Sequence, residues 1–208
     1  MLAQCGTPVV IHDETLERTT DGKGEVALTP WERLKALRLR DAHGRLTRDT
    51  LPCFEDVLLT CARLGLAANI EIKPSAGMAE RTGRHVAMLT RQLIRCHSVP
   101  VLLTSFERTA LDAAMSEAPD LAYGHLFDGD AQQAMDTGDL TGCSQLVFNA
   151  RRVTEASVRQ AMKYGYGVAV YTVNDVAEAR RMRSWGVAGV ISDEPERLAD
   201  ALGNGLLA

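Results

Sequence analysis

The sequence lacks long apolar runs, paired cysteine motifs and a strong excess of either charge. No uninterrupted apolar segment approaches the roughly 20 residues that a helix needs to span a bilayer, so we expect no membrane span. The formal net charge of the 208 residues is −4, which gives no electrostatic reason to expect nucleic acid or an anionic membrane as a partner. Apolar residues make up 46 % and charged residues 24 % of the chain, a balance typical of a globular protein.

Cysteines are few and scattered, and no two form a C-x-x-C pair. An odd number at irregular spacing predicts free thiols in a reducing compartment. No signal-peptide pattern follows Met1, so we expect a cytoplasmic protein. Internal repeats, low-complexity tracts and linkers are also absent, which predicts a single domain over residues 1–208. The five cysteines are Cys5, Cys53, Cys61, Cys96 and Cys143.

From about residue 67 onward, short apolar runs alternate with amphipathic segments. This alternation predicts a parallel sheet with right-handed crossovers. The six predicted βα units are fewer than the eight of a (β/α)₈ barrel. A doubly wound sheet, however, would carry a glycine-rich phosphate loop after an early strand, and this sequence has none. A barrel is therefore favoured. The predicted strands are Ala67–Lys73, Val99–Phe106, Leu121–Phe127, Gln145–Asn149, Gly167–Val173 and Ala188–Ser192. The predicted helices are Met78–Arg95, Arg108–Glu117, Glu155–Tyr164, Asp175–Trp185 and Pro195–Leu202.

Residues 1–66 follow a different pattern. Pro8–His12 is expected to be a short strand. Thr29-Pro30-Trp31-Glu32 combines a capping box with proline at the first helical position, which predicts the start of a short helix. A second helix is expected over Leu51–Leu64, ended by Gly65.

The segment Asn69-Ile70-Glu71-Ile72-Lys73 carries polar residues where a covered parallel sheet normally has apolar ones. Strand alternation places Ile70 and Ile72 on one face and the three polar side chains on the other. One interpretation is a structural ion pair between Glu71 and Lys73. The other is a site at a barrel mouth, where Glu71 binds a hard cation and Lys73 holds a phosphate. A third interpretation, Schiff-base chemistry at Lys73, is disfavoured by the neighbouring Glu71.

Pro8-Val9-Val10-Ile11-His12-Asp13 ends in adjacent histidine and aspartate residues. A lone histidine at a strand end is usually structural, and His125 and the other histidines are assigned to that class. His12 differs because the conspicuous run Leu16-Glu17-Arg18-Thr19-Thr20-Asp21-Gly22-Lys23-Gly24 follows it.

The run V-V-I-H-D-E-T-L-E-R-T-T-D-G-K-G resembles the pattern of the glycerophosphodiester phosphodiesterase family, H-D followed by L-x-R-T-T-x-G-x-G. The resemblance continues through Leu51-Pro52 with Glu55, N-I-E-I-K-P, T-S-F, Y-T-V-N and G-V-x-G-V-I-S-D-x-P. These motifs occur in the family's order over nearly the whole chain, although each one alone is a weak signal.

The resemblance implies an α/β fold, a TIM (β/α)₈ barrel of the phospholipase C-like phosphodiesterase type. Residues from about 4 to 51 would be the insertion after barrel strand 2, and residues from about 67 to 208 would carry strands 3–8. The chain would then lack the first strand, the first helix and most of the second strand of the barrel.

The resemblance also implies metal-dependent hydrolysis of glycerophosphodiesters to glycerol 3-phosphate and an alcohol, as part of lipid metabolism. His12 would be the general acid, Lys73 would neutralise charge at the phosphate, and Glu71 would bind a divalent cation, Mg or Ca. Asp13 would orient its neighbourhood. Tyr171, which stands where the family usually has tryptophan, would line the substrate pocket.

The family's opening H-R-G and E-x-D motifs have no counterpart in this sequence. They would supply a second histidine, an arginine and two further carboxylates. Glu71 alone would hold a cation weakly, so we expect impaired hydrolase activity in the chain as written. The alternative function is a non-catalytic barrel remnant that binds a phosphorylated metabolite or a partner.

Overall fold

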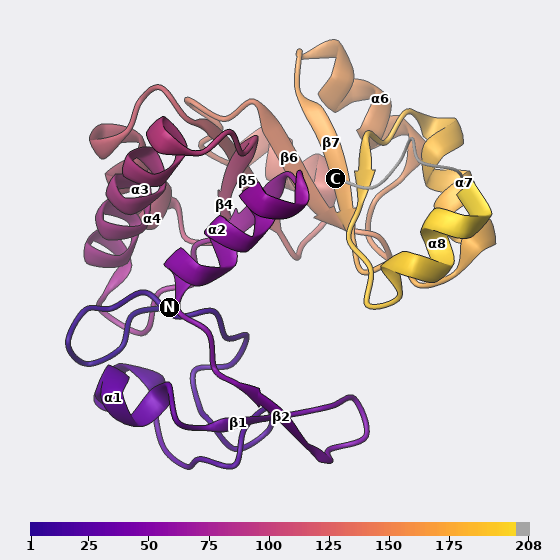
Figure 1. Ribbon diagram of the computed structural model, residues 1–208. Coiled ribbons are helices and arrows are strands. Elements are labelled where there is room, and N and C mark those ends of the chain that lie inside the picture. The colour runs from indigo at the N-terminus through magenta and orange to yellow at the C-terminus, as the bar shows by residue number, and fades with distance from the viewer. Residues whose placement is uncertain (203–208) are drawn as a thin grey trace. The chain divides into compact units, whose positions relative to one another are not determined.

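The computed structural model describes residues 1–202, and positions 203–208 lie outside the described residues. The main sheet has six strands in the order β3-β4-β5-β6-β7-β8, so neighbours in the sheet are also neighbours along the chain (Figure 1). All strand pairs from β4 to β8 are parallel, and a helix follows each strand. The strands are β3 (Ala68–Glu71), β4 (Val101–Ser105), β5 (Ala122–Phe127), β6 (Gln145–Asn149), β7 (Gly167–Tyr171) and β8 (Gly189–Val190).

Two compact units are distinguished by their internal contacts. Unit 1 comprises residues 1–101 and 109–121, and unit 2 comprises residues 102–108 and 122–208, so the boundary falls within β4. The single domain over residues 1–208 stays a prediction.

The N-terminal part of unit 1 consists mainly of turns around a small apolar core of its own. Its regular elements are short: a 3₁₀ turn at Val26–Leu28, α1 (Trp31–Leu34), and the antiparallel hairpin of β1 (Arg38–Arg40) and β2 (Leu46–Thr50). The core is formed by residues that are at most 7 % exposed, namely Met1, Ala3, Val9, Leu16, Val26, Leu34 and Leu51.

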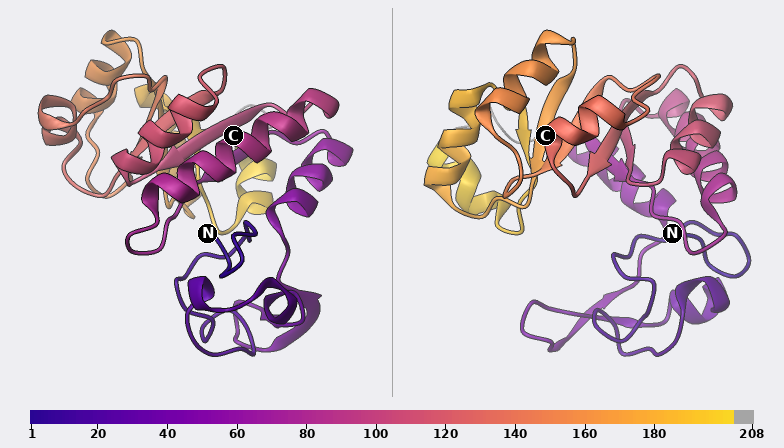
Figure 2. Two further views of the ribbon diagram at one scale, coloured as in Figure 1. Left: turned by 90° about the vertical axis from the view of Figure 1, so that its left-hand side faces the viewer. Right: turned by 180° about the vertical axis from the view of Figure 1, so that it is seen from behind.

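Three longer helices complete unit 1, namely α2 (Phe54–Leu64), α3 (Ala79–Cys96) and α4 (Arg108–Glu117). Helix α2 ends at Gly65, whose φ of 67° is the left-handed conformation that glycine adopts without steric cost. Helices α3 and α4 lie side by side (Figure 2). They approach so closely at Gly83 that a Cβ atom there would stand 2.0 Å from the carbonyl oxygen of Ala110.

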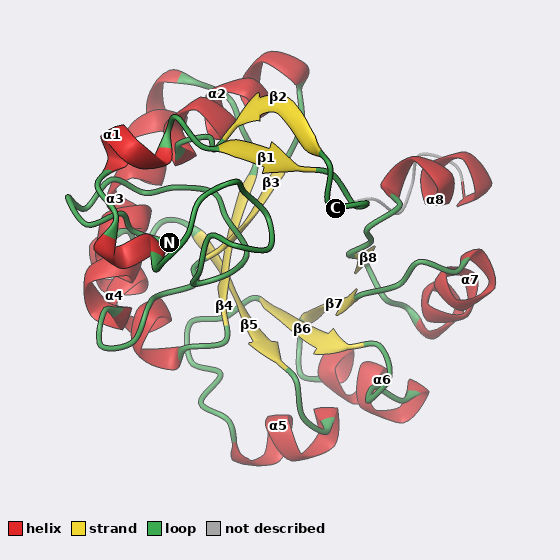
Figure 3. Ribbon diagram, turned by 90° about the horizontal axis from the view of Figure 1, so that it is seen from below, coloured by secondary structure: helices red, strands yellow, loops and turns green. Residues whose placement is uncertain are grey.

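In unit 2, the two faces of the sheet differ in what covers them. Helices α5 (Ala131–Thr137), α6 (Glu155–Lys163), α7 (Val176–Trp185) and α8 (Pro195–Leu202) lie on one side of strands β5–β8 (Figure 3). The larger apolar cluster lies on this side and includes Leu146, Phe148, Val168, Val170 and Met182. The opposite face carries the smaller cluster of Leu126, Val147 and Ala169, against which Tyr171 and Ile191 pack.

The helix ends of unit 2 follow the capping pattern expected from the sequence. Asp175 caps α7 by accepting a hydrogen bond from the backbone N–H of Glu178. Gly165 and Gly186 follow α6 and α7 with φ values of 90° and 100°.

The predicted strands and helices after residue 67 are confirmed in order and type, with ends that shift by a few residues. Helix α5 and the β1–β2 hairpin were not predicted. The five cysteines are unpaired, as expected. No helix among the described residues is long and apolar enough to cross a membrane.

Two predictions for the N-terminal part are wrong. Pro8–His12 forms no strand: Pro8 bridges Leu2 and Val9 bridges Cys53, so the chain changes partner before a ladder develops. The expected capping box is also absent, because Pro30 is itself the N-cap of α1 and the Thr29 hydroxyl donates to the carbonyl of Glu25 at 2.8 Å.

Candidate active site

One cavity of unit 1 is lined by His12, Glu71 and Lys73, the residues that the sequence predicts at the reacting centre. Its volume is about 480 Å³. Residues 8–12 form one wall of the cavity, with His12 at its end. Glu71 is the last residue of β3, and Lys73 lies two residues after it. The rest of the lining comes from α2, β3 and α3 and is mostly apolar. The fold therefore brings together side chains that are about 60 positions apart in the sequence.

Both faces of β3 border the cavity, since Asn69, Ile70 and Glu71 all line it. Ile72 is 1 % exposed, whereas Glu71 is exposed and Lys73 is half-buried. Among the described residues, the side chains of Glu71 and Lys73 make no hydrogen bond or ion pair, although both charges act on the buried ammonium group of Met1. The structural ion pair considered from the sequence is thus not formed, and both charges are available to a ligand.

His12 is held by a short chain of hydrogen bonds on the rim of the cavity. Its Nδ1 lies 2.7 Å from Oδ1 of Asp13. Arg18 donates two hydrogen bonds to the same carboxylate, from Nε at 2.5 Å and from Nη2 at 2.8 Å. These bonds, first from Arg18 and then from His12, hold the pKa of Asp13 well below its usual range. The ionised carboxylate of Asp13 accepts a hydrogen bond from the Nδ1–H of His12, which leaves the Nε2 atom of His12 for a substrate.

The sequence predicts no role for Arg18 beyond its place in the L-x-R-T-T motif. The structure shows that it fixes the carboxylate that orients His12. The spacing of five residues between Asp13 and Arg18 has no helical or strand periodicity to suggest a contact, because the chain turns between them. Only the resemblance to a family motif singled out this arginine.

The described residues do not form a complete site for a divalent cation. Glu71 is the only carboxylate that lines the cavity, and the oxygens of Asp13 already bind Arg18 and His12. Within residues 1–202 no group of three or more His, Cys, Asp or Glu side chains is arranged to hold a metal ion. Mg²⁺ and Ca²⁺ take six or more oxygen ligands, so one carboxylate does not fit such an ion.

Tyr171 lies in unit 2, at the end of β7. Its hydroxyl donates to the carbonyl of Phe127 at 3.0 Å and lies 3.4 Å from Oδ1 of Asp128. Its ring meets the ring of Phe106 edge to face, with centroids 5.8 Å apart. Its predicted role in lining a substrate pocket stays a prediction.

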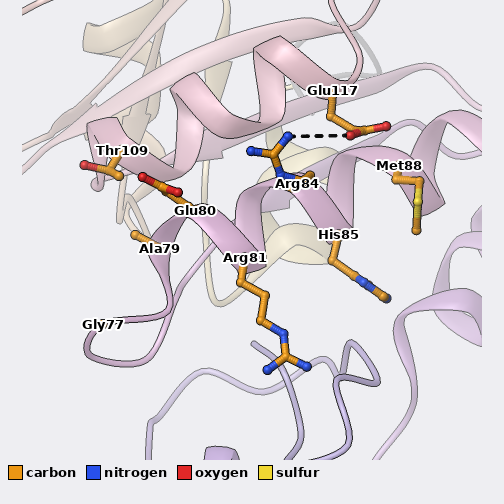
Figure 4. Close-up of a pocket in the computed structure, with 9 residues that line it drawn as sticks. All are labelled: Gly77, Ala79, Glu80, Arg81, Arg84, His85, Met88, Thr109 and Glu117. Atoms are coloured by element: carbon orange, nitrogen blue, oxygen red, sulfur yellow. Dashed lines mark ion pairs between the residues drawn. The ribbon is translucent and has the colours of Figure 1, made fainter.

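A second cavity of unit 1, of about 660 Å³, contains none of the predicted site residues (Figure 4). Arg81, Arg84 and His85 project from α3 around it, and Nη1 of Arg84 lies 4.0 Å from Oε2 of Glu117. Glu80 borders the same space. Because its positive and negative side chains balance, this cavity has no electrostatic preference for a phosphate, and we assign the chemistry to the first cavity.

Comparison with known sequences identifies relatives along almost the whole chain. The model of the glycerophosphoryl diester phosphodiesterase family matches residues 3–197. The glycerophosphodiester phosphodiesterase of Bacillus subtilis is 27 % identical over 92 % of this chain and 70 % of its own length. That of Caldanaerobacter subterraneus is 26 % identical over 98 % of this chain and 84 % of its own.

Solved structures agree with the sequence matches. A phosphodiesterase of Oleispira antarctica, in complex with the product sn-glycerol-3-phosphate, superposes with a TM-score of 0.83 at 26 % identity, over 97 % of this chain and 82 % of its own. A protein of Silicibacter pomeroyi matches in fold with a TM-score of 0.80 at 22 % identity, over all of this chain and 82 % of its own. These likenesses confirm the predicted α/β fold of the TIM-barrel type. The chain belongs to the glycerophosphoryl diester phosphodiesterase family.

Proposed function

We propose that this chain hydrolyses glycerophosphodiesters to glycerol 3-phosphate and an alcohol. The observation that carries the proposal is the cavity shared by His12, Glu71 and Lys73. Membership of the family and the glycerol 3-phosphate bound to the Oleispira antarctica relative support the substrate class. We further propose that the reaction serves the breakdown of phospholipid-derived metabolites in the cytoplasm.

His12 supplies the proton that the leaving alcohol needs. Its Nδ1 is bound to Asp13, so Nε2 is the atom that donates to the ester oxygen as the P–O bond breaks. The ammonium group of Lys73 neutralises negative charge that grows on the phosphoryl oxygens. No second histidine lines the cavity within the described residues, so His12 is assigned one proton transfer and the activation of water is assigned to no residue.

Glu71 contributes one oxygen donor toward a divalent cation, Mg or Ca. One carboxylate binds a hard cation weakly, and the remaining ligands are not found among residues 1–202. We therefore assign no catalytic step to a cation.

The incomplete set of donors favours a second candidate function, a barrel that binds a phosphorylated metabolite without turning it over. In that case Lys73 and His12 would hold the phosphate, and binding would be independent of added cation. The two candidates differ in one measurable property, the release of alcohol.

The test is release of glycerol 3-phosphate from glycerophosphoglycerol and glycerophosphocholine, with Mg²⁺ or Ca²⁺ and with excess EDTA. We expect His12→Ala to lower kcat by about 100-fold or more, the range for loss of a general acid. His85→Ala, in the second cavity, is the matched control and should retain activity. Turnover that survives His12→Ala would remove His12 from the reaction. Binding of glycerol 3-phosphate without any turnover would establish the second candidate.

A further inference from the structure

The basic residues of unit 2 are concentrated in the C-terminal halves of two neighbouring helices. Residues 156–174 include Arg159 and Lys163 and no acidic residue, and residues 179–192 include Arg180, Arg181 and Arg183 and likewise no acidic residue. The net charge of the whole chain is −4, so the overall composition does not show this local excess of positive charge. Helices α6 and α7 pack against each other on the outer side of the sheet (Figure 3).

Exposed apolar side chains lie among these basic residues. Met162 is 47 % exposed and Tyr164 is 59 % exposed. The ends of the two helices are in contact, because a Cβ atom at Gly186, directly after α7, would stand 2.7 Å from Sδ of Met162. Trp185, the last residue of α7, is half-buried beside them. We call the residues at these two helix ends the helix-end patch, namely Met162, Lys163, Tyr164, Arg183 and Trp185.

The acidic residues of the two helices do not neutralise the patch. Nη2 of Arg159 lies 2.6 Å from Oε1 of Glu155, and Nη2 of Arg181 lies 3.2 Å from Oε1 of Glu178. Both glutamates belong to the first turns of their helices, at the opposite end from the patch. Lys163 has no carboxylate partner among the described residues. The patch therefore combines positive charge with exposed apolar surface.

Basic residues at the end of a helix have an ordinary structural explanation. A cation there interacts favourably with the last carbonyl groups and with the negative end of the helix dipole. This explanation does not account for Met162 and Tyr164, which present apolar surface to water at the same place. Lysine and arginine are attracted to anionic lipid head groups, and tyrosine and tryptophan rings favour the interface of a bilayer. An acidic protein or a nucleic acid would be attracted by the charges alone.

We propose that the helix-end patch binds the surface of a bilayer that contains anionic phospholipid. Lys163 and Arg183 contact the phosphates of the head groups, while Met162 and Tyr164 enter the boundary between head groups and acyl chains. The contact is peripheral and needs no membrane span. The proposal goes beyond the proposed function and does not rest on it, because no residue of the cavity in unit 1 takes part.

The experiment measures co-sedimentation of the full chain with vesicles. Vesicles of phosphatidylcholine mixed with phosphatidylglycerol are compared with vesicles of phosphatidylcholine alone. We expect binding to the anionic vesicles only, and its loss at about 1 M salt, where the Debye length is about 3 Å. In Trp31→Phe, Trp185 is the remaining tryptophan, and its fluorescence should shift to shorter wavelength on binding. An unchanged emission from the bound chain would place the contact elsewhere.

Single substitutions separate the contribution of charge from that of apolar surface. Lys163→Gln and Arg183→Gln should each weaken binding to anionic vesicles about fivefold, the expected loss for one basic residue at such a surface. Met162→Ser and Tyr164→Ser should each weaken it about tenfold, because apolar area no longer leaves water. Arg151→Gln, which removes an exposed basic residue before the opposite end of α6, is the charge-matched control and should leave binding unchanged.

Three outcomes overturn the proposal. The first is equal binding to anionic and neutral vesicles, or binding to neither. The second is weakening by Lys163→Gln but not by Met162→Ser or Tyr164→Ser, which would assign the patch to an acidic macromolecule. The third is unchanged vesicle binding in Lys163→Gln while its thermal midpoint falls, which would leave only the structural role at the helix end. Diester hydrolysis is assayed without vesicles, so its success or failure does not affect this test.

Discussion

Asp13 joins two exposed side chains of the candidate site, His12 and Arg18, into one arrangement. The side chain of His12 is 70 % exposed and that of Arg18 is 63 % exposed, whereas the side chain of Asp13 between them is only 24 % exposed. Two long or exposed side chains thus depend on one better-protected carboxylate for their positions. A catalytic histidine needs this kind of support, because proton transfer requires a defined direction of the imidazole ring.

The lowered pKa of Asp13 leads to a prediction about acid stability. A carboxyl whose pKa is lower in the folded chain stabilises it above the unfolded pKa of about 3.9, and this contribution is lost as pH falls through the folded value. Arg18→Met should therefore lower the free energy of unfolding at pH 7, by less than about 1 kcal/mol for so exposed a pair. Its difference from wild type should shrink below about pH 4. Urea unfolding across pH measures it, with Arg33→Met as control. If the difference in free energy of unfolding between Arg18→Met and wild type stayed constant with pH, the stabilisation could not come from the ionised Asp13.

Glu71 allows a second prediction for a single residue. With one protein carboxylate, the affinity for Ca²⁺ or Mg²⁺ should be on the order of millimolar or weaker. Glu71→Gln should abolish that weak binding in calorimetry, whereas Glu80→Gln, in the second cavity, should not change it. Micromolar binding in both variants would show that other donors form the cation site.

The βα units could be predicted because their apolar periodicity and helix caps agree. Asp175 and Gly186, for example, mark the two ends of α7 in the sequence as they do in the structure. The β1–β2 hairpin could not be found in this way. Almost every residue of β2 is exposed. The hairpin therefore shows no alternation of apolar and polar residues from which it could be predicted. Helix α5 could not be predicted either, because its seven residues are too few to show a clear helical period.

Packing between α3 and α4 depends on the absence of a side chain at Gly83. The nearest atoms to an added Cβ belong to the backbone of Ala110, which cannot move without shifting α4. Gly83→Ala should thus destabilise the chain by about 1–3 kcal/mol, although alanine favours helices. Gly129→Ala, where an added Cβ meets nothing within 4 Å, is the matched control. Equal unfolding midpoints for the two variants would refute this account of the helix pair.

For the molecule as a whole, the fold brings together residues that are far apart along the chain. His12, Glu71 and Lys73 were predicted together, and they line one cavity. Asp128 and Phe106 look ordinary in the sequence, as an acid after one strand and an aromatic residue after another. Only the strand register of unit 2 places them beside Asn149 and Tyr171.

Acid should destabilise the folded chain in two separate steps, the first of them at His125. This side chain is 6 % exposed, its ring packs on Phe127 with centroids 4.2 Å apart, and its Nδ1 has no partner among the described residues. Burial lowers its pKa, an effect that nearby Arg108 strengthens and Asp139 opposes. The unfolded chain therefore takes up a proton first, and stability falls as pH drops below about 6.5.

The second step begins below about pH 4, where the carboxyl of Asp13 takes up a proton in the unfolded chain but not yet in the folded one. His125→Gln should remove the decline that begins below about pH 6.5 and leave the later one, while Arg18→Met should remove the later decline and leave the first. His43→Gln, in the exposed turn between β1 and β2, should leave both steps in place. Chemical unfolding at closely spaced pH values separates the two. A decline near neutral pH that persists in His125→Gln would assign that step to another group.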